Sequence, residues 1–85
     1  MPDDETNGLY LADPERELLA MVLMGDFALR ARVEDTPPGE EVDLTSAELA
    51  LLDDILAIEL EHTKDRSHRR ALEQVRERVA RILSL

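Results

Sequence analysis

The sequence has no cysteine and no tryptophan, and it has only one tyrosine and one phenylalanine. Without cysteine there is no disulfide framework, no thiolate metal site and no cysteine nucleophile. With two aromatic side chains, the chain also lacks the stacking surfaces on which single-stranded nucleic acid is bound. No apolar run approaches the roughly 20 residues that span a bilayer. These absences argue against membrane and nucleic-acid partners.

The charge is strongly acidic and unevenly distributed. The formal net charge is −10 over 85 residues; residues 1–61 contain seventeen acidic side chains and three arginines, whereas residues 66–85 contain six arginines and two glutamates. A chain of this length makes one domain, which buries only about 60–65% of the surface that its unfolded form exposes. We expect a cytoplasmic protein, because the acidic N-terminal sequence has neither a basic segment nor a long apolar run.

The first helix is expected over residues 14–33. Residues 1–12 show no periodicity, so they are expected to form a flexible acidic N-terminal tail before a single helical domain over residues 13–85. Asp13 and Pro14 are typical of a helix start. The apolar residues that follow are spaced by threes and fours, as on one face of a helix: Leu18, Leu19, Val22, Leu23, Leu29 and Val33.

Two further helices are expected over residues 46–63 and 67–84. Thr45 and Glu48 have the spacing of a capping box at the start of the first. In one continuous helix, the apolar residues after position 68 would lie on the side opposite to those before it, so a turn is expected near residues 63–67. Asp65 or Ser67 would cap the helix after that turn. The fold class is therefore all-α, a small three-helix antiparallel bundle that is completed by dimerisation.

Four polar residues are candidates for a metal site at one end of this bundle. Glu59 and His62 form a Glu-x-x-His spacing, which is similar to the half-motif that each of two helices supplies in ferritin-like di-iron bundles. Antiparallel packing would bring Glu15 and His68 to the same end, and such oxygen and nitrogen donors suit iron, zinc or manganese. The favoured interpretation is a solvated helix end without a metal or other cofactor, where these groups form surface ion pairs, and the metal site is the alternative.

Asp26 is an acidic residue in the middle of the first apolar stripe. If it is buried, it needs a partner, because an isolated buried carboxylate is costly. Arg30 is one candidate, and an arginine of the third helix or of a second subunit is another. The alternative is a local kink, since Gly25 weakens the helix at this point.

Five apolar residues are expected to form an interface. Met21, Met24 and Phe27 lie outside the main stripe of the first helix, and Leu51 and Ile58 lie on a wide apolar face of the second. We therefore expect a non-enzymatic protein–protein interaction module that forms a homodimer and binds a further, unidentified protein. Two alternatives are a ferritin-like metal-binding half-subunit and an acidic inhibitor that mimics nucleic acid. No nucleophile stands beside a base, so an enzyme is not expected.

Overall fold

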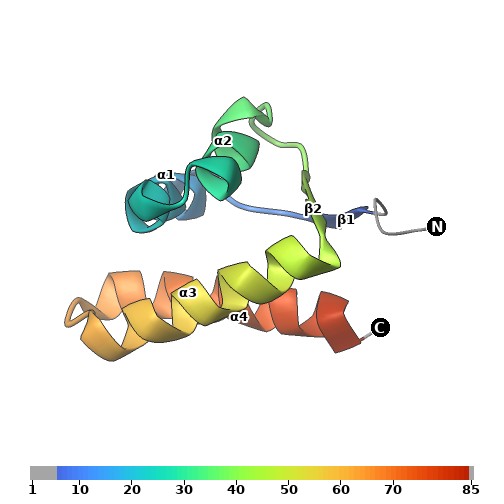
Figure 1. Ribbon diagram of the computed structural model, residues 1–85. Helices are drawn as coiled ribbons and strands as arrows, with labels where there is room; N and C mark the ends of the chain where they lie inside the picture. Colours follow the sequence, from blue (N-terminus) through green and yellow to red (C-terminus); the bar gives the residue numbers. More distant parts are fainter. Residues whose placement is uncertain (1–5, 85) are drawn as a thin grey trace.

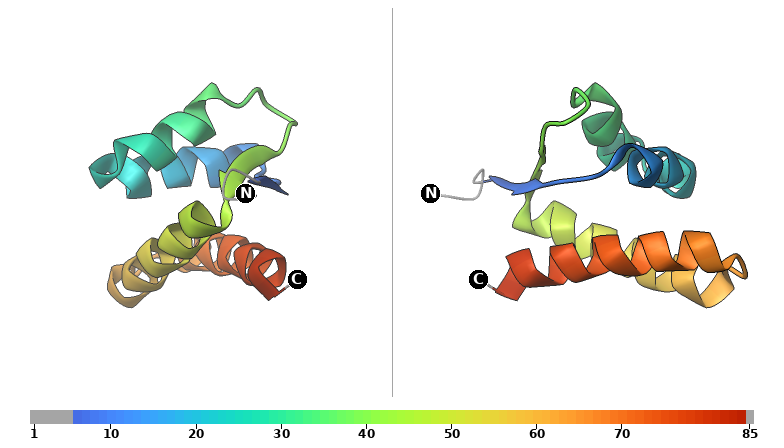
Figure 2. Two further views of the ribbon diagram at one scale, coloured as in Figure 1. Left: turned by 45° about the vertical axis from the view of Figure 1, so that its right-hand side comes forward. Right: turned by 180° about the vertical axis from the view of Figure 1, so that it is seen from behind.

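The computed structural model describes residues 6–84, which fold into two helical layers joined at one side by a small sheet (Figure 1). One layer consists of α1 and α2 with the short 3-10 helix η2, and the other is the antiparallel pair of α3 and α4 (Figure 2). The elements in chain order are β1 (Thr6–Leu9), α1 (Asp13–Val22), η2 (Leu23–Gly25), α2 (Phe27–Asp35), β2 (Val42–Thr45), α3 (Ser46–His62) and α4 (Arg66–Ser84). The described chain is mostly helical, as expected, but it has four α-helices and a two-stranded sheet instead of three helices.

The N-terminal segment differs from the expected flexible tail. Residues 6–9 form strand β1, which pairs antiparallel with β2 so that Thr6 lies opposite Thr45 and Leu9 lies opposite Val42. Leu9 and Leu11 are both 1% exposed. The backbone pairing and the burial of these two leucines hold residues 6–11 against the rest of the fold. Residues 1–5 of the expected tail lie outside the described residues.

The helix expected over residues 14–33 is broken at Asp26. The residue has an extended backbone (φ −127°, ψ 95°), and its side chain accepts a hydrogen bond from the Leu29 N–H at 3.1 Å. Asp26 therefore caps the start of α2, and it follows Gly25, the weakest helix former of the segment. The break turns α2 relative to α1, yet Leu19 and Leu29 both remain buried in one core.

The α3–α4 pair agrees closely with the expected bounds. The Thr45 hydroxyl accepts a hydrogen bond from the Glu48 N–H at 3.1 Å, and the Glu48 carboxylate accepts one from the Thr45 N–H at 2.9 Å. This confirms the capping box at the start of α3. Asp65 caps α4 by accepting hydrogen bonds from the N–H groups of Ser67 and His68 at 2.8 and 3.2 Å. The expected turn is thus confirmed, and it occupies residues 63–65.

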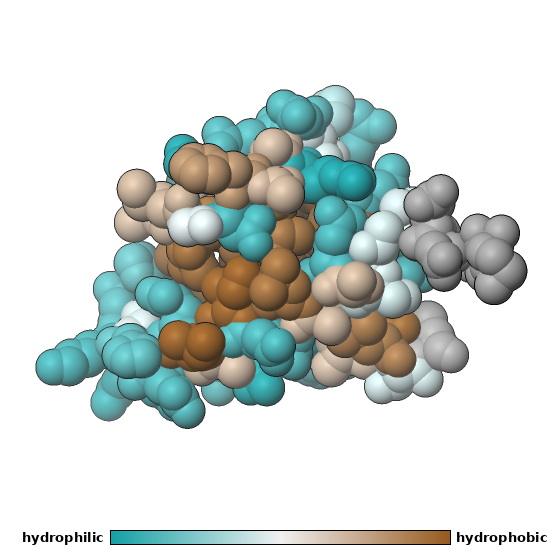
Figure 3. Space-filling view, in the orientation of Figure 1, coloured by the Kyte–Doolittle hydropathy of each residue, from teal (hydrophilic) through white to brown (hydrophobic). Residues whose placement is uncertain are grey.

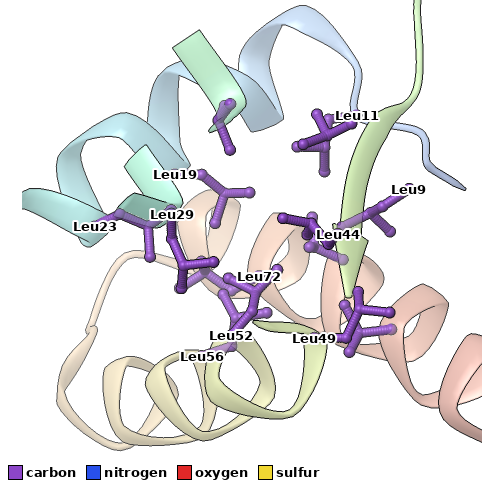
Figure 4. Close-up of a cluster of buried hydrophobic side chains, with 14 residues drawn as sticks. Leu9, Leu11, Leu19, Leu23, Leu29, Leu44, Leu49, Leu52, Leu56 and Leu72 are labelled. Carbon is purple, nitrogen blue, oxygen red and sulfur yellow. The ribbon is translucent and has the colours of Figure 1, made fainter. Parts of the chain in front are cut away.

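The core lies between the two layers and is almost entirely leucine and valine (Figure 4). Its leucines come from both layers and from the segment around the sheet, so every element helps to enclose it. The buried apolar residues are Leu9, Leu11, Leu19, Leu23, Leu29, Val33, Val42, Leu44, Leu49, Leu52, Leu56, Leu72, Val75 and Val79. Burial of this set is the main stabilising contribution to the fold.

Candidate functional site

Seven large apolar side chains are exposed among the described residues, and five of them belong to α1, η2, α2 and α3. Met21, Met24 and Phe27 are 63%, 64% and 79% exposed, and Leu51 and Ile58 are 44% and 57% exposed. These five residues, named the apolar face below, are those that the sequence predicts as an interface. Figure 3 shows brown, hydrophobic surface over α3 that continues towards α1 and α2. The structure therefore leaves this surface open to solvent.

The break at Asp26 explains why three residues of the apolar face, Met21, Met24 and Phe27, are exposed. Met21 lies in the last turn of α1, Met24 lies in η2 and Phe27 begins α2, so all three residues are near the point where the chain changes direction. In one long helix, Asp26 would occupy the apolar stripe between Leu23 and Leu29. The break instead directs both leucines into the core, where each is at most 2% exposed. Met21, Met24 and Phe27 remain outside.

The other two residues of the apolar face, Leu51 and Ile58, lie on one side of α3. Leu51 and Ile58 are seven residues apart, so they lie two turns apart on the same side of the helix. Ile55 lies between them and packs partly against the core. The opposite side of α3 carries Leu49, Leu52 and Leu56, which are buried. The wide apolar surface of this helix therefore has one side in the core and one side without a partner in the described chain.

A small groove adjoins the apolar face where α1 approaches the turn between α3 and α4. Its floor is apolar, and Glu59, Thr63 and His68 add polar groups to its wall. The lining residues are Leu18, Met21, Val22, Glu59, Thr63, His68 and Leu72. Two of the four predicted metal ligands, Glu59 and His68, thus border the same groove.

The other two predicted ligands do not join them. His62 is exposed, and its Nδ1 atom lies 2.8 Å from the Ile58 carbonyl oxygen of the same helix. Glu15 is only 6% exposed and forms an ion pair with Arg78 at 2.6 Å. Within residues 6–84, no three His, Asp or Glu side chains lie close enough together to hold a metal ion. The structure therefore does not assemble Glu15, Glu59, His62 and His68 into one ligand set.

Glu15 instead links three segments of the chain. Its Oε1 atom accepts hydrogen bonds from the Ala12 N–H at 2.8 Å and from Arg78 Nη1 at 2.6 Å. Arg78 also donates to the Tyr10 carbonyl oxygen at 3.2 Å. The pair joins the start of α1 and the residue that follows β1 to α4. Sequence spacing could not reveal it, because 63 residues separate its members.

Asp26 is not the buried ion-pairing residue that its place in the stripe suggested. It is half-buried, and its carboxylate is used as the cap of α2. Arg30, the expected partner, pairs with Glu34 at 2.7 Å. The alternative expectation of a local break near Gly25 describes this position correctly.

The acidic surface is partly neutralised by the chain itself. Of the carboxylates between residues 34 and 61, Glu34, Glu48 and Asp53 form ion pairs with Arg30, Arg32 and Arg76. Mimicry of nucleic acid requires a continuous array of free carboxylates, and these pairs interrupt it. This arrangement gives the nucleic-acid-mimic hypothesis less support than the apolar face gives to an interaction module.

The comparisons with known proteins identify no relative. No family model, no curated protein and no solved structure matches the chain. Among the described residues, no helix has the length and apolarity that a membrane crossing requires. The case for a function therefore rests on the surface of the molecule.

Proposed function

We propose that this protein is a small, non-enzymatic helical interaction module that self-associates through its apolar face. The observation that carries the proposal is the exposure of five large apolar side chains over neighbouring elements of one surface. Contiguous apolar patches of more than a few hundred Å² are rare on monomers and mark interaction sites. The residues of the apolar face each expose 44–79% of their surface.

The chemistry of the face suits a protein partner. Phe27, with 79% exposure, is a large rigid side chain of the kind that anchors interfaces. Met21 and Met24 are flexible and polarisable, so they adapt to the surface that covers them. Leu51 and Ile58 extend the contact along α3. A second copy presents the same side chains, and a two-fold contact of these faces would bury both at once.

The small core adds a reason for association. A chain of 85 residues hides a modest share of its surface, and burial of a second apolar surface against another copy adds to the stability of the folded state. Interaction with a further, unidentified protein is part of the proposal, as in small adaptor and regulatory modules.

The experiment compares the self-association of three variants by sedimentation equilibrium. Phe27→Ser and Ile58→Ser each remove a side chain of the apolar face, and Leu83→Ser changes a residue outside the face that is 41% exposed. We expect the two face variants to raise the dimer dissociation constant about tenfold or more, as at interface hot spots. Leu83→Ser should leave it unchanged. Equal dissociation constants for all three variants and the wild type would overturn the proposal.

A further inference from the structure

Within residues 6–84, most of the Lys and Arg side chains that form no ion pair with a carboxylate lie in one place. Arg30, Arg32, Arg76, Arg78 and Arg81 each form an ion pair with a carboxylate. Arg16 donates to the carbonyl oxygens of Val33, Thr36 and Pro37 instead. The remaining four form a group, named the basic turn below, where α3 passes into α4: Lys64, Arg66, Arg69 and Arg70.

All four side chains of the basic turn are available to a partner. Each residue is exposed, and none has a carboxylate of residues 6–84 within 4.0 Å. Arg69 makes one long contact of 3.4 Å with the Leu60 carbonyl oxygen. Asp65 is the acidic residue among them, and the N–H groups of Ser67 and His68 engage its carboxylate. The basic turn therefore carries a net positive charge on a protein whose total charge is −10.

A complementary group lies between α2 and β2. Residues 35–43 carry four exposed acidic side chains, named the acidic connector below: Asp35, Glu40, Glu41 and Asp43. None of the four has a Lys, Arg or His nitrogen of the described residues within 4.0 Å. The acidic connector therefore groups four of the described carboxylates that form no ion pair.

The two groups are far apart in one molecule. In Figure 1 the basic turn lies at the lower left and the acidic connector at the upper right, and the views of Figure 2 also separate them. Figure 3 shows hydrophilic surface at both places and hydrophobic surface between them. The groups cannot neutralise each other within one chain, but they flank the surface on which a second copy would dock.

We propose that two copies pack their apolar faces antiparallel about a two-fold axis, so that the basic turn of each contacts the acidic connector of the other. The inference rests on the proposed function, because it assigns the orientation of the second copy on the apolar face. Two-fold symmetry makes the charge contact twice, once at each end of the interface. A parallel arrangement would place like charges together.

The charge contacts also explain how two chains of charge −10 associate. Uniform acidity would make the copies repel each other, whereas opposite local charges at the rim of an interface steer the encounter and select the orientation. Exposed charges are screened beyond a Debye length of about 10 Å at 0.1 M salt. Salt should therefore weaken the contacts between the basic turn and the acidic connector.

The test is a charge swap in two full-length variants. Lys64→Glu, Arg66→Glu and Arg70→Glu together make the basic turn acidic, and Asp35→Lys, Glu40→Lys and Glu41→Lys together make the acidic connector basic. Each variant alone has repulsive contacts at both ends of a homodimer. In an equimolar mixture, the acidic turn faces a basic connector at one end, and a basic turn faces an acidic connector at the other. The mixture therefore restores attraction at both ends.

The positions are chosen so that each variant folds. Asp35 ends α2 and Arg66 begins α4, where a lysine and a glutamate respectively suit the helix dipole. Arg69 is left unchanged because of its contact with the Leu60 carbonyl oxygen. Circular dichroism and thermal unfolding verify the fold of each variant. Arg81→Glu, on an exposed residue of α4 outside both groups, controls for a change in total charge.

The readout is the dissociation constant from sedimentation at low salt. We expect each swapped variant to dissociate about tenfold more readily than the wild type, the mixture to form a heterodimer of nearly wild-type affinity, and Arg81→Glu to behave as the wild type. Homodimers of unchanged affinity, a mixture that stays monomeric, or a mixture that grows beyond the dimer would each overturn the inference. If the charge variants behave as the wild type while Phe27→Ser disrupts the dimer, the proposed function survives without this orientation. A monomeric wild type would contradict both.

Discussion

Replacing Arg78 by Met removes the partner of the one charged residue that is buried among the described residues. Glu15 is 6% exposed, and its carboxylate lies 2.6 Å from Arg78 Nη1. Removing one member of a buried pair costs about 3–5 kcal/mol when both charges are fully desolvated. The Arg78 side chain is 34% exposed, so water screens the pair and the cost should be smaller, about 2 kcal/mol. The Ala12 N–H still satisfies part of the Glu15 carboxylate.

The assay is thermal unfolding followed by circular dichroism at pH 7 and one fixed protein concentration, because association would make Tm depend on concentration. For a domain of this size, 1 kcal/mol lowers Tm by about 4–8 °C, so Arg78→Met should lower it by about 8–16 °C. Arg81→Met is the matched control: its arginine lies one turn further along α4, is 75% exposed and pairs with Glu77. Such an exposed pair contributes at most about 0.5 kcal/mol.

A double-mutant cycle with Glu15→Gln isolates the pair itself. Glutamine keeps an oxygen for the Ala12 N–H but removes the charge that Arg78 compensates. We expect Arg78→Met to cost less in the Glu15→Gln background, with a coupling energy of about 1 kcal/mol or more. The reasoning is refuted if Arg78→Met is no more destabilising than Arg81→Met, or if the two substitutions at Glu15 and Arg78 are additive.

Two further predictions concern the caps of α3 and α4. Thr45→Ala should lower the free energy of unfolding by about 0.5–2 kcal/mol, because the Glu48 N–H loses its acceptor; an unchanged urea midpoint would contradict this. The hydrogen bonds from the N–H groups of His68 and Ser67 lower the pKa of Asp65 below its ordinary value of 3.8. Because the folded state favours the ionised Asp65 carboxylate, ionisation of this group stabilises the fold. This stabilisation is complete above the ordinary pKa of the group and is lost as the pH falls through the lowered pKa. Asp65→Asn should therefore flatten the dependence of stability on pH below the ordinary value of 3.8. An acid limb identical to that of the wild type would count against this role.

The parts of the fold that were predicted correctly depend on local signals. The Thr45–Glu48 box and the Asp65 cap lie within a few residues of the helix starts that they determine, so their spacing is visible in the sequence. The reversal of apolar phase after residue 68 depends only on helical geometry. Exposure of the five residues of the apolar face also follows from their phase. Whether they form an interface stays a prediction.

The parts that were missed depend on contacts between distant residues. Strands β1 and β2 have four residues each and start 36 positions apart, so neither is long enough to produce a clear periodic signal. The alternation of Val42 and Leu44 with polar residues was the available sign of β2. The break at Asp26 had a local signal, because a capping residue follows Gly25. The continuous apolar stripe of the segment indicated the opposite, an unbroken helix. The burial of Glu15 depends on its ion pair with Arg78, which is distant in the sequence, so residue spacing does not predict it.

The most direct test of self-association is the mass of the wild-type protein in solution, measured by light scattering from low to high micromolar concentration. The chain has a mass of 9.6 kDa. If the apolar face binds a second copy, the measured mass will rise with concentration and level off at twice the chain mass. A mass that stays at that of one chain over the whole range would contradict the central claim.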